Sequence, residues 1–203
     1  VETRSMPRSL GVDNCLKRGA GALVRLSHQG RSAPLRVHLR QSTLRNTGGI
    51  VRWTKTACQS GIQPLMLIVE NSVFEVFVAG ACVVDESTTR GGLLEFSEES
   101  PVTGWERMVR VTGEGSLLRP ETMLAGSVPA PNATPVPLKT SQLRVEGLLI
   151  DEFAYLGSDS ADPASSVIAS SQVPRSSPVP PGIDAQELPS SQNLPIVAKQ
   201  GSP

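Results

Sequence analysis

Aromatic side chains are scarce in this sequence, whose 203 residues include four phenylalanines, two tryptophans and one tyrosine. A core must therefore be built mainly from valine, leucine, isoleucine and alanine, which bury less area per residue than aromatic side chains do. Long apolar runs are missing too, since the longest are short stretches such as residues 65–69. A membrane-spanning helix needs about 20 apolar residues, and the first residues lack the pattern of a signal peptide. We therefore expect neither a membrane span nor a signal peptide.

Residues that commonly carry catalysis or bind metals are also few. The histidines are His28 and His38, and neither belongs to a pattern that pairs a base with a nucleophile or a metal. The cysteines, Cys15, Cys58 and Cys82, match no metal-binding or redox spacing, so the sequence predicts buried, reduced thiols. We predict a non-enzymatic protein with no catalytic residue, no cofactor and no metal ligand.

The formal net charge of zero conceals two oppositely charged parts. Residues 1–55 carry eleven lysines and arginines, nine of them arginine, against two acidic residues, whereas the remaining residues carry eight basic against seventeen acidic residues. Arginine-rich segments can neutralise phosphates through bidentate contacts, so the basic part predicts a nucleic acid or another acidic partner. The alternative is that the basic part pairs with the acidic part of the same chain or with an acidic neighbour.

Short apolar segments separated by turn residues dominate residues 22–127. The clearest is residues 35–40, where Leu35, Val37 and Leu39 alternate with basic residues and predict a strand with a basic outer face. Further strands are expected at residues 23–26, 50–53, 62–69, 73–78, 82–84, 93–96 and 105–112. No window shows the 3.6-residue apolar period of a helix. We therefore predict an all-β fold, an antiparallel, jelly-roll-like β-sandwich.

The composition changes after residue 120, since thirteen of the seventeen prolines lie between Pro120 and Pro203. The sequence thus predicts four segments: a basic N-terminal arm (residues 1–21), the β-sandwich domain (22–127), a proline-rich linker with an apolar docking segment (128–157), and a Pro/Ser-rich tail (158–203). The tail has few apolar residues to offset the entropy cost of ordering it. We expect it to be extended, and ordered only where a partner surface holds it.

Three segments combine residue types in an order typical of one family. In residues 44–69 an arginine, a tryptophan, a basic residue and a glycine precede an apolar strand. Residues 96–111 contain an acidic turn, a tryptophan and a strand, and residues 124–137 lead into a proline-rich exit. Together they resemble the small coat proteins of comovirus-like plant viruses in the picorna-like group. The resemblance implies one jelly-roll capsid domain, released from a polyprotein, with its basic side toward RNA in an icosahedral shell.

On this resemblance we expect a structural subunit of a virus capsid, which assembles in the virion with neighbouring coat subunits around the genome. Its sequence-nonspecific RNA contacts are expected at Arg4, Arg8, Lys17 and Arg18 in the basic arm. Two alternatives remain open. One is a structural component of a large ribonucleoprotein or another cytoplasmic or organellar assembly, and the other is a β-domain adaptor that presents proline motifs such as residues 178–181 to groove-binding partners.

If the tail is a separate segment, deleting residues 158–203 should leave the domain folded. Thermal unfolding followed by circular dichroism should then show one cooperative transition in the truncated chain. Loss of that transition would show that the tail belongs to the folded unit.

Overall fold

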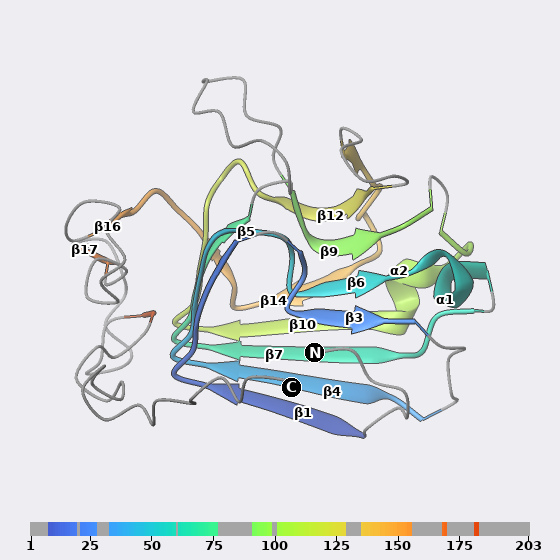
Figure 1. Cartoon of the computed structure of the whole chain (residues 1–203), viewed down its shortest axis with the longest axis horizontal. Helices are drawn as coiled ribbons and strands as arrows, with labels where there is room; N and C mark the ends of the chain where they lie inside the picture. The colour runs from blue at the N-terminus through green and yellow to red at the C-terminus, as the bar shows by residue number, and fades with distance from the viewer. Residues whose placement is uncertain are drawn as a thin grey trace, which may run out of the picture.

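The chain winds in successive coils, and each of the first four coils adds one strand to each of three sheets (Figure 1). The computed structural model describes residues 8–19, 21–27, 33–59, 61–76, 91–98, 101–128, 135–155, 168–169 and 181–182. Within these residues, strands from successive coils pair in parallel, as in β4 with β7 and β7 with β10. The fold is a parallel β-solenoid.

Each of the three sheets has five strands. Sheet 1 contains β1 (Ser9–Asp13), β4 (Leu35–Arg40), β7 (Leu65–Glu70), β10 (Val109–Glu114) and β14 (Arg144–Glu146). Sheet 2 contains β2 (Leu16–Gly19), β5 (Thr43–Thr47), β8 (Val73–Val76), β11 (Leu117–Leu118) and β15 (Leu149–Ile150). Sheet 3 contains β3 (Val24–Leu26), β6 (Val51–Trp53), β9 (Gly92–Phe96), β12 (Met123–Ser127) and β13 (Val136–Pro137). Only β13, which runs antiparallel to β12, departs from the parallel arrangement of these sheets.

Four shorter elements lie outside the three sheets in the described part of the chain. They are the helices α1 (Lys55–Gln59) and α2 (Trp105–Met108), and the antiparallel pair formed by β16 (Ala154–Tyr155) and β17 (Ile168–Ala169). The helix α1 follows β6 and α2 precedes β10, so both occupy connections between sheet 3 and sheet 1.

The expectation of an all-β fold is confirmed, but the antiparallel jelly-roll-like sandwich is wrong. An alternation of apolar and polar residues says which side chains face the core, and it is the same for parallel and antiparallel strands. The direction of pairing depends on the connections, and here each strand leads around a corner into the next sheet instead of returning beside itself. A solenoid results because every strand pairs with the equivalent strand of the next coil.

Several predicted boundaries also differ from the structure. Residues 9–19, predicted as part of an arm, form β1 and β2 of the first coil. Residues 144–150, predicted as a docking segment in a linker, form β14 and β15. The strand predicted at residues 105–112 begins as the one-turn helix α2, because Gly104 adopts a left-handed φ of 83° that starts a turn before β10.

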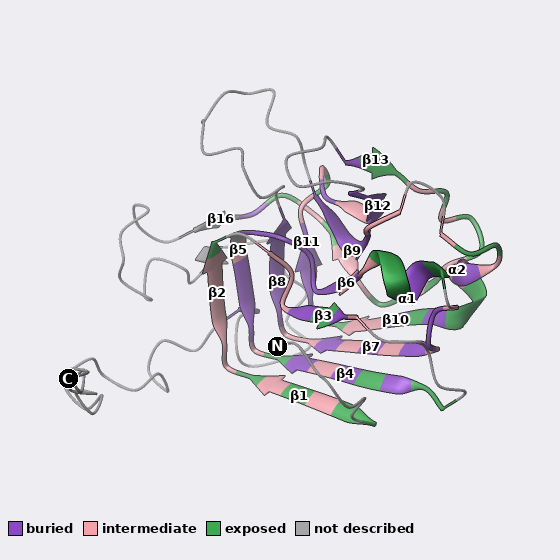
Figure 2. Ribbon diagram, turned by 45° about the vertical axis from the view of Figure 1, so that its right-hand side comes forward, coloured by how far each residue is buried: buried purple, intermediate pink, exposed green. Residues whose placement is uncertain are grey.

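The core fills the interior that the three sheets surround, and it is built from columns of apolar side chains. Val37, Leu67 and Val111 occupy successive positions of one column and are fully buried. Three aromatic residues gather at one place in the core, where the rings of Trp53 and Phe96 stack with centroids 4.7 Å apart and Trp105 lies 4.8 Å from Phe96. Figure 2 shows the alternation of buried and exposed residues along β4 and the continuous burial along β8.

The corner between sheets 1 and 2 repeats a single backbone geometry. In each of the five coils the residue that directly follows the strand of sheet 1 has a positive φ angle. These residues are Asn14 (44°), Gln41 (47°), Asn71 (46°), Gly115 (59°) and Gly147 (72°). Asparagine and glycine tolerate this conformation well, because the asparagine side chain can bond locally and glycine has no Cβ atom. The register aligns these turns in the first four coils, whereas β14 ends opposite Thr112, two residues before the end of β10.

Serine side chains connect these corners from one coil to the next. The Oγ atom of Ser72 accepts a hydrogen bond from the backbone N–H of Ser42 at 3.1 Å and donates one to the carbonyl of Glu70 at 2.8 Å. In the next coil, the Oγ atom of Ser116 accepts from the N–H of Ser72 at 3.1 Å. This serine ladder satisfies backbone groups that the turning chain would otherwise leave buried without partners.

Glycines allow the coils to approach each other closely around sheet 3. A Cβ atom on Gly49 would lie 2.3 Å from the carbonyl oxygen of Gly92, and one on Gly92 would lie 2.6 Å from the backbone nitrogen of Gly126. Since backbone atoms cannot move aside as a flexible side chain can, larger residues at these positions would force the coils apart.

The serine ladder predicts a large cost for a small substitution. Ser72→Ala should lower the free energy of unfolding by about 1–3 kcal/mol, because it leaves the buried N–H of Ser42 without its acceptor. Urea unfolding checks this value. Ser9→Ala, at an exposed position of β1, is the control and should change the free energy of unfolding by less than about 0.5 kcal/mol. Equal effects of the two substitutions would contradict a stabilising role for the ladder.

Candidate anion-binding groove

A column of positively charged side chains lies on the outer face of sheet 1. Along each strand of this sheet the residues between the core positions point outward. The register aligns Arg36 of β4, Met66 of β7, Arg110 of β10 and Arg144 of β14, each near the beginning of its strand. Neighbouring parallel strands lie about 4.8 Å apart, so Arg110 and Arg144 are adjacent and Met66 separates them from Arg36.

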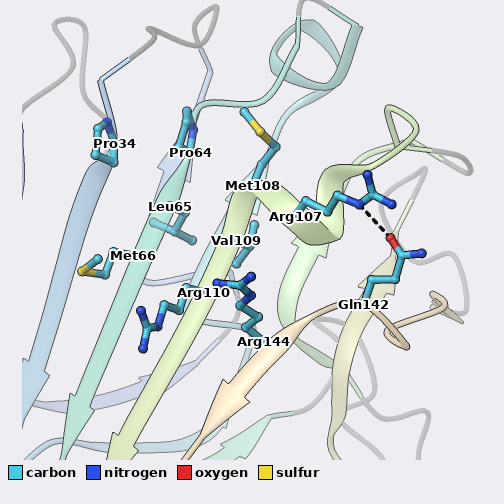
Figure 3. Close-up of a pocket in the computed structure, with 10 residues that line it drawn as sticks. All are labelled: Pro34, Pro64, Leu65, Met66, Arg107, Met108, Val109, Arg110, Gln142 and Arg144. Atoms are coloured by element: carbon cyan, nitrogen blue, oxygen red, sulfur yellow. Dashed lines mark hydrogen bonds between the residues drawn. The ribbon is translucent and has the colours of Figure 1, made fainter.

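Met66, Arg110 and Arg144 of the column line a groove of about 520 Å³ between the strand starts and α2 (Figure 3). The residues that line it are Pro34, Pro64, Leu65, Met66, Arg107, Met108, Val109, Arg110, Gln142 and Arg144. Its apolar lining includes two prolines and two methionines, and three arginines supply the charge. No aromatic side chain is among these lining residues.

A short hydrogen-bonded chain orients one of the arginines. The Nε atom of Arg107 in α2 donates to the Oε1 atom of Gln142 at 3.0 Å, as Figure 3 shows. The backbone N–H of Gln142 in turn donates to the carboxylate of Glu106 at 3.2 Å. The segment that precedes β14 is thereby attached to α2. The remaining N–H groups of the Arg107 guanidinium can donate elsewhere, since a guanidinium has five in all.

The arginines of the column differ in how far acidic residues neutralise them. Arg110 pairs with Glu146 at 2.9 Å, at an exposed position where such a pair contributes little to stability. Among the residues that the structure describes, Arg36 and Arg144 have no acidic partner within ion-pair distance, and both are exposed. The start of sheet 1 therefore carries a net positive charge that a bound anion could neutralise.

The other end of the same face is predominantly acidic. The register aligns Asp13, Arg40, Glu70 and Glu114 at the ends of their strands, beside the corner. Arg40 pairs with Asp13 at 2.6 Å, and its hydrogen bond holds the pKa of the Asp13 carboxyl below the usual value. His38 lies 3.1 Å from Glu70. In the described residues, no group of histidine, cysteine and acidic side chains could hold a metal ion.

Of the four predicted RNA contacts, the three in the described residues are divided between the edge of sheet 1 and sheet 2. Arg4 lies outside the described residues. Arg8 is exposed beside the start of β4, where its carbonyl accepts the N–H of Arg36 at 3.0 Å. Lys17 and Arg18 belong to β2 in sheet 2, and both are partly buried. These positions do not test whether the residues contact RNA, and the RNA contacts stay a prediction.

Lys17 has structural contacts of its own. It aligns with the core residues Leu44 and Phe74, so it stands at the inward position of the first coil. Its Nζ atom donates to the Thr47 hydroxyl and, at 3.2 Å, to the carbonyl of Gly19. Burial lowers the pKa of this amine. A lysine at the edge of a stack also discourages pairing with another chain.

The groove contains arginines that sequence reasoning missed. Of the column, only Arg36 was recognised on a basic strand face, because it alternates with core residues in residues 35–40. Arg107, Arg110 and Arg144 belong to the part of the chain with a net negative charge. The charge asymmetry along the sequence pointed away from them, whereas the parallel register brings Arg110 and Arg144 into the column that contains Arg36.

The described cysteines do not resemble activated nucleophiles. Burial raises the pKa of the Cys58 thiol to about 11 and also raises the pKa of Cys15. A thiol with such a pKa is protonated near neutral pH, whereas the thiolate is the reactive form. Cys82, the third cysteine, lies outside the described residues.

Comparison with known proteins found no matching family model and no significant match to a curated protein or to a solved structure. Among the described residues, no helix has the length and apolar character needed to cross a membrane.

A buried carboxyl in sheet 3 couples the stability of the fold to pH. Glu95 in β9 is 3% exposed, accepts the backbone N–H of Gly49 at 2.8 Å, and lies 3.9 Å from a guanidinium nitrogen of Arg52. Burial is the largest influence and raises the pKa of Glu95 above its ordinary value of 4.5. The folded chain therefore retains the Glu95 proton to a higher pH than the unfolded chain does. As the pH rises from the pKa of Glu95 in the unfolded chain through its pKa in the folded chain, the contribution of this group to the free energy of unfolding falls.

Glu95→Gln should test this coupling, because glutamine keeps the acceptor for Gly49 but cannot ionise. The difference in unfolding free energy, variant minus wild type, should increase as the pH is raised from about 4 to about 7. Urea unfolding at several pH values measures it. Glu114→Gln, at an exposed carboxylate, controls for the general loss of a negative charge. A pH-independent difference at Glu95 would contradict the coupling.

Proposed function

We propose that this chain is a non-catalytic binding module that holds an anionic glycan against the outer face of sheet 1. The observation that carries the proposal is the register that aligns Arg36 with Arg110 and Arg144, two arginines that line an open groove. Among the described residues, Arg36 and Arg144 have no acidic partner. The solenoid supplies rigidity, because each strand of the column is hydrogen-bonded to its neighbours.

The arginines favour a ligand with carboxylate or sulfate groups. A guanidinium presents planar, paired N–H donors that match the two oxygens of a carboxylate, and such charge-assisted bonds are stronger than neutral ones. Arg110 and Arg144 are one strand spacing apart, about 4.8 Å, and Arg36 continues the column two strands from Arg110. A ligand that lies across the strands can therefore meet successive guanidinium groups.

The remainder of the face favours a glycan over a nucleic acid. Bases of single-stranded nucleic acids are commonly bound by stacking on aromatic side chains, and the lining of the groove includes none. The acidic strand ends, with Glu70 and Glu114, repel any anionic group, so this part of the face suits only the uncharged polar groups of a ligand. The hydroxyl groups of a sugar can instead donate hydrogen bonds to such carboxylates. A glycan with acidic groups toward the arginines and hydroxyl groups toward the corner suits both ends.

The expectation of a virus coat protein depended on a jelly-roll domain, and the computed fold removes that support. Capsid assembly and RNA contacts at the N-terminal basic residues stay predictions, as does assembly in a ribonucleoprotein. Binding of RNA in the assay below would favour these alternatives over the glycan.

The test compares four probes of similar length at moderate ionic strength: a polyuronate, a sulfated glycan, a neutral glucan and single-stranded RNA. Isothermal titration calorimetry should detect the acidic glycans and not the neutral one. Arg144→Ala and Arg110→Ala should each weaken binding about tenfold or more, because each removes a hydrogen bond to a charged group worth about 1.5–3 kcal/mol. Arg144→Lys keeps the charge but loses the paired donors, so its affinity should be intermediate.

The matched control is Arg25→Ala, which removes an exposed arginine from β3 in sheet 3, away from the groove. Its affinity for the acidic glycans should equal that of the wild type. Binding that Arg25→Ala and Arg144→Ala weaken equally would indicate general charge attraction. Binding of RNA alone, unchanged by either groove substitution, would also overturn the proposal.

A further inference from the structure

The strands β8 and β11 of sheet 2 are buried on both faces, unlike the strands of sheet 1. Leu44, Phe74 and Leu118 point into the main core. The residues that alternate with them point away from that core, yet Thr43 and Val73 are 0% exposed and Leu117 is 1% exposed. Because no solenoid strand in the described part of the chain lies outside sheet 2, another part of the chain must cover this outer face.

One cover is Phe153, which follows β15. Its ring belongs to a separate apolar cluster with Val73 and Leu117 on the outer face. Arg119 fixes Phe153 in place, since its guanidinium carbon lies 4.6 Å from the centre of the ring and its Nη2 atom donates to the Phe153 carbonyl at 3.0 Å. The Nε atom of the same guanidinium also forms an ion pair with the Oε1 atom of Glu75 at 2.8 Å.

The second cover comes from the C-terminal region. Pro181 and Gly182 are both buried, and the N–H of Gly182 donates to the carbonyl of Asn71 at 2.7 Å. Asn71 is the corner residue that precedes β8, so this bond attaches Pro181 and Gly182 to the edge of sheet 2.

Only glycine fits at position 182. A Cβ atom there would lie 2.8 Å from the hydroxyl oxygen of Thr43 and 3.3 Å from a methyl group of Val73. The φ angle of Gly182 is also 103°, which is unfavourable for any residue with a Cβ atom. The contact therefore combines a backbone hydrogen bond, a close approach to two side chains of sheet 2, and a conformation reserved for glycine.

We propose that the outer face of sheet 2 is a peptide-docking surface with selectivity for a Pro–Gly pair, and that its occupant is the Pro181 and Gly182 pair of this chain. The docked pair acts as a latch that closes over Thr43 and Val73. Since Pro181 also ends the proline motif of residues 178–181, docking withholds this proline from any partner that must contact its ring. This latch lies on sheet 2 and does not depend on the arginine groove of sheet 1.

The latch can be tested by the accessibility of position 43. A Thr43→Cys chain carries a thiol beneath the latch, and its alkylation rate can be followed by peptide mass spectrometry separately from the native cysteines. Adding Gly182→Val should open the latch and raise the alkylation rate at position 43 about tenfold or more. Adding Gly11→Ala instead is the control, because a Cβ atom on Gly11 meets no atom within 4 Å; the rate should then stay unchanged.

A second arm does not require a folded Gly182→Val chain. A site for a specific protease is inserted after Ser171 of the Thr43→Cys chain, which is folded first and then cut. Removing the C-terminal fragment should raise the alkylation rate at position 43, and adding a synthetic peptide of residues 176–188 should lower it again. The same peptide with Gly182→Val should have no effect. Unchanged alkylation rates both after removal of the fragment and in the Gly182→Val chain would overturn the proposal.

Discussion

The constraint on which the rest of the structure depends is that most strands of this chain find their hydrogen-bond partners in the next coil. A hairpin strand pairs with its neighbour in sequence, but here β4 pairs with β1 and β7, and β7 pairs with β4 and β10. A coil of different shape would therefore leave buried N–H and carbonyl groups without partners on both sides. The repeated corner, with its positive φ angles and its serine ladder, keeps the coils alike where the chain turns most sharply.

This constraint also organises the surface. Parallel pairing in register places equivalent outward residues of successive strands in columns. The residue types in each column therefore determine the chemistry of that part of the face. On sheet 1 the column at the strand starts contains arginines, and the column at the strand ends contains Asp13, Glu70 and Glu114. On sheet 2 the outward residues include Val73 and Leu117, which are apolar and need a cover. The two faces thus serve different purposes: one remains open to solvent and the other receives a later part of the chain.

Much of the strand content could be predicted from the sequence, because alternation is a local property. Leu35, Val37 and Leu39 were expected to share the inner face of a strand, and all three are buried in β4. The direction of pairing could not be obtained in the same way. Register partners such as Arg36, Met66 and Arg110 are separated by unequal lengths of chain, since long connections interrupt the later coils. Unequal spacing hides a solenoid from any search for a fixed period.

A signal for the solenoid nevertheless exists at the corners. Residues 40–42, 70–72 and 114–116 each contain a charged residue, then a residue with positive φ, then a serine. Each triplet follows an alternating strand, and the serine begins the next apolar segment. The triplet has a physical cause, because the middle residue makes the turn and the serine bonds the adjacent coil. Aligning the triplets would have revealed the register of Arg36, Met66 and Arg110 in three successive strands.

The candidate groove was harder to predict than the strands, because net charge along a sequence says little about charge on a folded surface. Along the sequence, basic residues dominate positions 1–55 and acidic residues dominate the remainder. In the solenoid the two parts interleave, so that Arg40 meets Asp13 from the same part, while Arg45 and Arg52 meet Glu75 and Glu95 from the other. Many charges are paired in this way, so an arginine that lacks an acidic partner among the described residues can interact with a ligand. Arg36 comes from the basic part and Arg144 from the acidic part, and only the stacking of coils places both in one column. A binding surface built in this way depends on the register of the whole sheet, so a shift of one coil would separate its arginines even if every strand remained intact.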